Sequence, residues 1–424
     1  MNRPMQRRVL IVADDLTGAA DAAVTFRAAG WRAFVAMDPH ANTARWPVAA
    51  LSTESRSLGA QEAADAVGLA VFLAQPQGCL VLKKIDSLLR GSVVAETTAA
   101  LQASGAELAL VAPALPAQRR TTMDARVFVD GAPLSSVGRA LDPLAPPLSG
   151  DLRALFTAAG GATCLPLELV RCGADAVAEA LRRASTPVVL ADAKSDSDLD
   201  NLAHGMLLAG KQVVPCGSSG LAAALARALP PPAPFQAANA TMRLACHRVL
   251  VVVGSQSAVA AGQVAHLEGA TGDAVRIDAA ALVGHTDASL AAARDAAIHC
   301  LRSRPVAAVV LTDLAHLCNA KVPARELRRM ESLVASALAR LAADVVRGVE
   351  VHGLVLSGGS TAAAVLRAIG VSGLDVQGEV MPGIPASLAV GGRLDGAVVV
   401  TKAGAFGAAA ALTYAARYLV GSDE

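Results

Sequence analysis

Short, continuously apolar segments that stop abruptly at charged residues constrain the fold of this chain more than any other feature. Val9–Ala13 predicts a buried strand that must end at the acidic pair Asp14 and Asp15. Cys79–Leu82 predicts a second buried strand, which runs directly into the charged segment Lys83–Asp86. A turn and an alanine-rich stretch typical of a helix follow each of them. Strands that are apolar on both faces and alternate with helices are typical of parallel sheets covered on both sides.

The same alternation continues along the chain in two blocks separated by the proline-rich segment Pro230–Thr241. In the first block we predict seven strands, at Val9–Ala13, Arg32–Ala36, Ala49–Ser52, Cys79–Leu82, Leu108–Ala112, Val188–Ala193 and Gln212–Cys216. Predicted helices there are Ala19–Ala29, Ala60–Gln75 and Val93–Ser104. In the second block the pattern restarts at Arg248–Ser257 and continues with strands Ala308–Thr312, Gly353–Ser357 and Ala397–Thr401. We therefore predict an α/β protein of two domains, residues 1–232 and 240–424, each with a mostly parallel sheet flanked by helices.

Composition excludes several classes of partner. The chain is 54% hydrophobic but only 3% aromatic, with a net charge of +1, so a nucleic-acid surface with basic patches and stacking rings is not expected. No apolar run approaches the roughly 20 residues of a membrane span, and the apolar run near the start is too short for a secretory signal. The seven cysteines form no C-x-x-C pair, which favours reduced thiols and a cytoplasmic protein.

Charged side chains follow the first and fourth predicted strands. Asp14 and Asp15 end one strand, and Lys84, Asp86 and Arg90 follow the other in a K-K-x-D-x-x-x-R pattern. In an open parallel sheet, ligands bind in the crevice beyond the carboxyl ends of the strands. We therefore predict a site for a small polar molecule there. The alternative is that Asp14 and Asp15 only cap the helix that follows, because aspartate favours N-cap positions.

The stretch from Pro113 to about Pro166 shows neither a helical nor a strand period and is too long for a simple connection. It contains Gln118–Gly131, which is rich in basic and hydroxyl side chains. We predict an irregular segment that acts as a lid.

Three glycine-rich turns characterise the second half, at Gly254–Ser257, Ser357–Thr361 and Lys402–Gly407. Each follows a strand and begins a helix, which presents unpaired backbone N–H groups to an anion such as phosphate. Neither the P-loop nor the dinucleotide glycine pattern occurs. Lys402 is placed to balance phosphate charge, or alternatively is a solvated lysine at a strand end. Met381–Gly392 predicts a proline-braced loop that either walls a nucleotide pocket or only connects strands.

Six motifs together resemble the four-carbon acid sugar kinase family over nearly the whole chain: ADDLTGAADAA, STESRSL, KKIDSLLRGS, LSGGSTAAAVLRAIG, GEVMPGIP and VTKAGAFG. The resemblance implies a two-domain enzyme whose N-terminal domain grips the acid sugar and whose C-terminal domain holds ATP. It also implies phosphorylation of the terminal hydroxyl of a tetronate such as erythronate, threonate or 3-oxotetronate.

Site residues follow from the same resemblance. It implies sugar-acid contacts at Asp14, Arg56, Lys84, Asp86 and Ser87. The nucleotide contacts that it implies are Ser255, Ser357, Gly358, Gly359, Ser360, Thr361 and Gly404, and we place Gly383 and Lys402 in the same site. This chain departs from the family pattern at Ser360, which replaces an aspartate, at Leu88 and Ser92, and at Arg119 and Ala125, which replace glycines of the lid segment. These departures leave the substrate stereoisomer open.

The charged residues of the predicted site suggest roles in phosphoryl transfer. We expect Arg56 to bind the carboxylate of the acid sugar in a bidentate fork, with Arg90 as a second candidate that could instead pair with Asp86. The acceptor of the hydroxyl proton stays open among Asp14, Asp15 and Asp86. Mg²⁺ is expected with ATP, and its protein ligands are unknown.

Two other functions are compatible with these residues. An aldolase-type enzyme would use Lys83 or Lys84 as a Schiff base, and a sugar-acid sensor would bind without catalysis. A dehydrogenase is disfavoured by the missing dinucleotide glycines. Expected partners are a small sugar acid and ATP, and whether the chain forms a homo-oligomer is left open.

Overall fold

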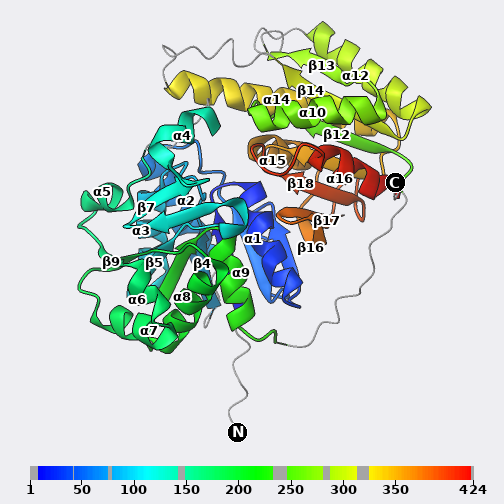
Figure 1. Ribbon diagram of the computed structural model, residues 1–424. Helices are drawn as coiled ribbons and strands as arrows, with labels where there is room; N and C mark the ends of the chain where they lie inside the picture. Colours follow the sequence, from blue (N-terminus) through cyan, green and yellow to red (C-terminus); the bar gives the residue numbers. More distant parts are fainter. Residues whose placement is uncertain are drawn as a thin grey trace. The chain divides into compact units, whose positions relative to one another are not determined.

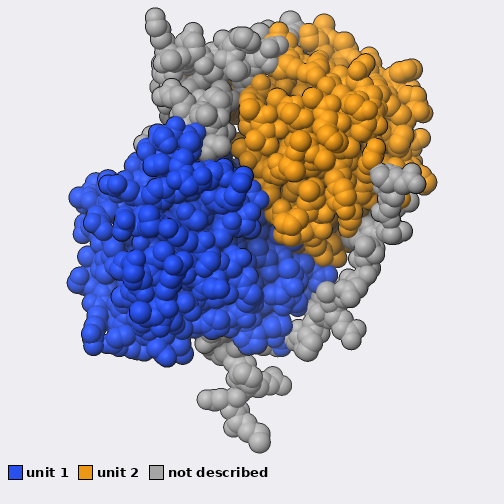
Figure 2. Space-filling view, viewed as in Figure 1, with its two compact units in different colours: residues 1–140, 145–236 blue, residues 141–144, 237–424 orange. Residues whose placement is uncertain are grey.

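The computed structural model describes residues 8–41, 43–74, 79–141, 149–232, 246–279, 287–312 and 324–421. The chain divides into two compact units (Figures 1 and 2). Unit 1 comprises residues 1–140 and 145–236, and unit 2 comprises residues 141–144 and 237–424. Of the predicted boundary segment, residues 233–241 lie outside the described residues, as does Gln75, the predicted end of one helix. None of the helices in the described part of the chain is both long and apolar enough to cross a membrane.

Unit 1 is built on a parallel sheet. Its strands lie in the order β2 (Ala33–Ala36), β3 (Val48–Ser52), β1 (Arg8–Ala13), β4 (Cys79–Lys84), β11 (Val213–Gly217), β5 (Leu108–Ala112), β10 (Val188–Ala191) and β9 (Thr163–Leu165). The seven predicted strands are all present, with ends that differ by at most two residues. The chain leaves β1 toward β3 and β2 but leaves β4 toward the opposite edge, so the topological switch point lies between β1 and β4. Ligand crevices of open α/β sheets form at such points.

Two layers of helices cover this sheet (Figure 1). In one layer α1 (Leu16–Ala28), α9 (Ser219–Ala228), α8 (Asp196–Leu208) and α7 (Ala174–Arg183) pack side by side, and in the other α2 (Ala60–Ala74) packs on α3 (Val93–Ser104). Because parallel connections are right-handed, the reversal of direction at β1 puts α1 and α2 on opposite faces. Burial on both faces explains why the strands are continuously apolar rather than alternating.

The segment predicted to be irregular is folded, so that part of the prediction is wrong. Its antiparallel sheet consists of β6 (Arg120–Met123), β7 (Arg126–Val129) and β8 (Ala132–Pro133), preceded by the 3-10 turn Pro116–Gln118 and followed by α4 (Leu134–Leu141) and α5 (Leu152–Thr157). Strands of two to four residues are too short to show a period of two. The turn residues Arg119 and Ala125 have left-handed backbones, with φ of 52° and 57°. Since glycine usually marks such positions, these turns gave no signal in the sequence.

Unit 2 has a mixed sheet. Its strands lie in the order β13 (Val275–Asp278), β14 (Val306–Thr312), β12 (Val249–Val253), β15 (Gly353–Ser357), β18 (Val398–Lys402), β17 (Ile384–Val390) and β16 (Gly373–Met381). The first five are parallel, and β17 runs antiparallel to both neighbours. Helices α10 (Ala258–Thr271) and α16 (Ala411–Val420) pack together, and α14 (Ala324–Gly348) packs on α12 (Asp287–Ser303) and α15 (Gly359–Ala368). The predicted α/β class, with mostly parallel sheets, is confirmed.

The antiparallel hairpin β16–β17 corrects one prediction. Met381–Gly392, predicted as a loop, contains the hairpin turn and all of β17. Proline lacks a backbone donor and normally argues against a paired strand. Pro385 is tolerated here beside an irregularity in the pairing between Glu379 and Met381.

Candidate active site

Four predicted residues of unit 1 meet at the switch point of its sheet. Arg56, in the loop after β3, donates from Nε to Asp14 Oδ2 at 2.7 Å and from Nη2 to Asp14 Oδ1 at 2.9 Å. Its Nη1 donates to Asp15 Oδ2 at 2.5 Å, and its Nη2 lies 3.8 Å from Asp86 Oδ1. The backbone fixes this loop, because Arg56 N donates to Asp14 O at 3.2 Å. The guanidinium predicted to bind a substrate carboxylate is therefore already forked onto protein carboxylates.

Asp86 is held by the second candidate arginine. Arg90 donates to its two carboxylate oxygens from Nε at 2.7 Å and from Nη2 at 2.9 Å. Burial alone would raise the pKa of Asp86, but Arg90 and Arg56 outweigh it and hold that pKa well below its usual range. Burial is likewise outweighed at Asp14, where Arg56 lowers the pKa of the carboxyl. Both carboxylates therefore stay ionised at neutral pH.

Asp15 caps the helix that follows it, one of the two alternatives that the sequence left open, and also contacts Arg56. Its Oδ1 accepts from Gly18 N at 2.7 Å, which makes it the N-cap of α1. Its Oδ2 accepts from Thr17 Oγ1 at 2.9 Å and also from Arg56. Helix capping thus accounts for Asp15 but not for Asp14, whose carboxylate faces Arg56.

The two lysines at the end of β4 differ in their surroundings. Lys83 is fully buried and forms an ion pair with Glu96, Nζ to Oε2 at 2.9 Å. Its Nζ also donates to the carbonyl oxygens of Val12 and Lys84. Lys84 Nζ donates to Ile85 O at 3.1 Å. Lys83 is therefore a structural cation, which disfavours it as the Schiff-base lysine of an aldolase.

One functional candidate was not singled out from the sequence. Arg120 of β6 donates from Nη1 to Ser87 Oγ at 2.5 Å, so the folded lid segment contacts the end of the Lys83–Ser87 segment. The basic character of Gln118–Gly131 was visible in the sequence, but nothing there distinguished Arg120 from its neighbour Arg119, which is 80% exposed.

The three glycine-rich turns of unit 2 converge at the carboxyl ends of β12, β15 and β18. A Cβ on Gly404 would lie 2.1 Å from Ser255 Oγ, and one on Gly254 would lie 2.0 Å from Thr361 Oγ1. Ser257 Oγ donates to Gly404 O at 3.0 Å. Only glycine allows these close approaches, so the turns are parts of one site rather than three unrelated connections.

Lys402 lies beneath this site. The Lys402 side chain is 1% exposed, and its Nζ donates to three carbonyl oxygens within residues 403–406 at 2.8–3.2 Å. Gln263 Nε2, which the sequence gave no reason to select, donates at 2.9–3.1 Å to the carbonyl oxygens of residues 406–408, the first of which also accepts from Lys402. Burial lowers the pKa of Lys402 to about 7. The alternative of a solvated lysine is therefore wrong. In the structure the Lys402 ammonium stabilises the backbone of the turn that follows it.

The remaining predicted nucleotide residues lie around the same turns. Gly358 is the N-cap of α15, with φ of 106° and no side-chain cap, so the first amides of this helix have no intrahelical or capping partner. Ser357 Oγ is buried without a hydrogen-bond partner among the described residues. Ser360 is exposed in the first turn. Gly383, in the β16–β17 turn, packs against the ring of Phe406.

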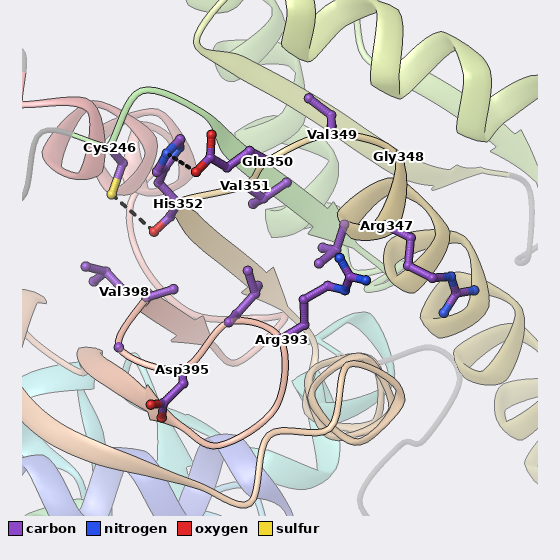
Figure 3. Close-up of a pocket in the computed structure, with 14 residues that line it drawn as sticks. Cys246, Arg347, Gly348, Val349, Glu350, Val351, His352, Arg393, Asp395 and Val398 are labelled. Carbon is purple, nitrogen blue, oxygen red and sulfur yellow. Dashed lines mark hydrogen bonds and ion pairs between the residues drawn. The ribbon is translucent and has the colours of Figure 1, made fainter.

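A pocket of about 660 Å³ lies at the amino ends of β15 and β18 (Figure 3). It is lined by residues 346–352, before β15, by residues 393–398, before and at the start of β18, and by Cys246. His352 and Glu350 face each other there, with Nε2 and Oε1 3.6 Å apart. Because the glycine-rich turns lie at the carboxyl ends of these strands, none of the predicted nucleotide residues lines this pocket. Within the described ranges, no three His, Cys, Asp or Glu side chains are grouped as they would be around a metal ion.

Comparison with known proteins identifies the family. Residues 9–225 match the family model described as a sugar-binding N-terminal domain, and residues 250–412 match the one described as a nucleotide-binding C-terminal domain. The D-threonate kinase of Bordetella bronchiseptica is 36% identical over 94% of both chains, and that of Cupriavidus necator is 36% identical over 96% of both. This chain belongs to the four-carbon acid sugar kinase family.

Other relatives of this kinase act on related acids. The D-erythronate kinase of Heliobacterium modesticaldum is 32% identical over 97% of both chains. A crystal structure from Salmonella typhimurium superposes with a TM-score of 0.74 at 23% identity, covering 96% of this chain and 98% of that one, which supports the fold. The predicted sugar-acid kinase is confirmed at the level of the family, and the aldolase-type and sensor alternatives are set aside.

Proposed function

We propose that this kinase transfers the terminal phosphoryl group of ATP to the terminal hydroxyl of a four-carbon sugar acid, with D-threonate as the first candidate. One observation carries the proposal: each unit has a polar site at the carboxyl ends of its strands, and the two sites differ in chemistry. Unit 1 offers a cluster of ionised side chains, and unit 2 offers backbone amides between glycines. D-threonate comes first because two relatives at 36% identity are D-threonate kinases.

The unit 2 site suits the phosphates of ATP. The amides at the start of α15 point out of the helix, where the helix dipole favours negative charge. Lys402 and Gln263 bind the carbonyl oxygens of residues 403, 404 and 406–408, so these acceptors already have protein donors and need not face the phosphates. Mg²⁺ is expected with ATP, and the phosphates and water would supply most of its ligands.

The unit 1 site suits a polyhydroxy acid. Each carboxylate oxygen has a second lone pair, so Asp14 can accept a hydrogen bond from a substrate hydroxyl while Arg56 holds it. Its lowered pKa makes Asp14 a weak base. Phosphoryl transfer depends on positioning and charge neutralisation more than on early proton removal. We therefore assign Asp14 to orient the attacking hydroxyl and Arg56 to position Asp14.

The test is a substrate panel. Purified protein is incubated with ATP, Mg²⁺ and each stereoisomer of threonate, erythronate and 3-oxotetronate, while ADP release is measured and the product is located by phosphorus NMR. We expect ADP release with at least one acid and a phosphate ester on its terminal carbon. Folded protein that releases no ADP with any of them would refute the proposal.

A further inference from the structure

Arg120 differs from the other arginines of the unit 1 site. Among the described residues it has no carboxylate within 4.0 Å, its Nη1 donates to the neutral Ser87 Oγ, and its Nε is buried without a hydrogen-bond partner. Arg56 and Arg90, in contrast, each use a full fork on an aspartate. Arg120 is half-buried, and a guanidinium that is partly withdrawn from water is costly unless an anion pairs with it. The position of Arg120 is therefore suited to an anionic ligand.

The backbone holds Arg120 in place from two sides. Leu115 N donates to Arg120 O at 2.8 Å, and Arg120 N donates to Leu115 O at 3.1 Å. The β6–β7 turn is fastened to unit 1 by Asp192, whose carboxylate accepts from Asp124 N at 2.8 Å and from Ala125 N at 3.0 Å. With the backbone fixed and Nη1 bonded to Ser87, less freedom remains for the Arg120 side chain to lose when a ligand binds, which favours affinity.

Charges around Arg120 are balanced only at longer range. Burial lowers its pKa, Asp86 and Asp21 oppose that effect, and Arg90 reinforces it. Asp21 is influenced by both Lys84 and Arg120, so the two cations share a neighbourhood. Burial raises the pKa of Asp21, which weakens it as a counter-charge for either cation.

A comparison of the cations in the site also indicates which of them can bind a substrate carboxylate. The fork of Arg56 is filled by Asp14 and Asp15, that of Arg90 is filled by Asp86, and Lys83 is paired with Glu96. Lys84 and Arg120 are the cations of this cluster for which the described residues show no ion pair. Of the two, only a guanidinium can bind a carboxylate bidentately.

We propose that Arg120 binds the carboxylate of the sugar acid, the role first expected of Arg56, with Lys84 beside it. This inference rests on the proposed function, because it presumes an acid substrate in unit 1. It makes Arg120 the residue that distinguishes a sugar acid from a neutral polyol, and it gives the lid segment a specific chemical task.

The experiment compares Arg120→Met with the matched control Arg126→Met, whose side chain lies on the adjacent strand β7 and is 64% exposed. For each, KM is measured for D-threonate, for the neutral analogue threitol and for ATP. We expect Arg120→Met to raise the KM for D-threonate about 10- to 100-fold, which corresponds to losing a charge-assisted contact. The KM for ATP and turnover of threitol should stay at the wild-type level, and the control should match wild type throughout.

Two results would overturn the inference. The first is an unchanged KM for D-threonate in Arg120→Met. The second is an equal loss for D-threonate and threitol, which would indicate a structural role only. If wild type phosphorylates no acid, the proposed function fails first, and calorimetric titration of D-threonate without nucleotide then decides about Arg120. Binding that is weakened in Arg120→Met alone supports the inference, and equal or absent binding in all three proteins refutes it.

Discussion

Removing the Arg56 guanidinium should destabilise unit 1 in a pH-dependent way. Arg56→Met deletes three hydrogen bonds to Asp14 and Asp15 and leaves two buried carboxylates without their main partner. Breaking a buried ion pair from one side costs about 3–5 kcal/mol in the free energy of unfolding. Because the Arg56 side chain is 20% exposed, we expect the lower end, about 3 kcal/mol at pH 7.

The sign of the pH dependence follows from the pKa of Asp14. In wild type, burial raises and Arg56 lowers this pKa, with a net lowering, so the stabilisation is present above the unfolded-state value of 3.8 and is lost as pH falls through the folded value. In Arg56→Met, burial prevails and raises the pKa, so the ionised carboxylate destabilises the variant at neutral pH. Protonation removes this cost as pH falls. The difference in stability between the two proteins should therefore shrink from pH 7 to pH 5.

Tryptophan fluorescence is a suitable assay, because both tryptophans, Trp31 and Trp46, lie in unit 1 and are buried. Urea midpoints at pH 7 and pH 5 give the loss in stability. The double variant Arg56→Met/Asp14→Asn should be more stable than Arg56→Met at pH 7, because it removes one of the stranded charges. A wild-type midpoint for Arg56→Met, or a loss equal at both pH values, would refute the reasoning.

Three further predictions concern the glycine-rich turns of unit 2 and the β6–β7 turn of unit 1. Gly359→Val should raise the KM for ATP strongly, because a side chain would hold phosphate away from the amides of α15. The affinity for the sugar acid, measured without nucleotide, should stay constant. Loss of both affinities together with a lower melting temperature would indicate a packing role instead. Lys402→Met removes one of the two donors that bind each of three carbonyl oxygens in its turn, and it should raise the KM for ATP more than that for the sugar acid. Steady-state kinetics showing the reverse would contradict this role. Ala125→Gly should stabilise unit 1 by about 1 kcal/mol, because glycine adopts the left-handed backbone of this position without strain. Tryptophan fluorescence should then show a higher urea midpoint. An unchanged or lower midpoint would show that the turn is not strained.

Much of the fold follows from the sequence because each central strand carries its own signal. Val9–Ala13 of β1 and Cys79–Leu82 of β4 are continuously apolar, as strands buried on both faces are, and both run directly into charged residues. The β16–β17 hairpin was missed because Pro385 lies within a strand beside a pairing irregularity. In the lid, Arg119 and Ala125 adopt backbones that normally require glycine, so the turns were not recognisable.

The pairing of charges within the candidate site could not be predicted from the sequence. The ends of β1 and β4 bring Asp14 and Asp86 to one place, as their positions predicted, and Arg56, which the family resemblance implied, lies with them. The partner of each charge, however, depends on side-chain geometry between residues some 40 positions apart, so the sequence suggested that Arg56 was free to bind substrate. In the part of the chain that the structure describes, Arg120 has no carboxylate partner, and a missing contact leaves no pattern in a sequence.

The inward position of Lys402 has a consequence for how nucleotide binding responds to salt. It is the one charged side chain within the three glycine-rich turns, and its ammonium faces carbonyl oxygens of its own turn. The polyphosphate would then be held by neutral N–H and O–H dipoles, whose attraction acts at short range and is little affected by a Debye length of about 8 Å at physiological ionic strength. Sugar-acid binding, which relies on full charges in unit 1, should weaken as salt is added. Raising the ionic strength should therefore increase the KM for the acid more than the KM for ATP at saturating Mg²⁺.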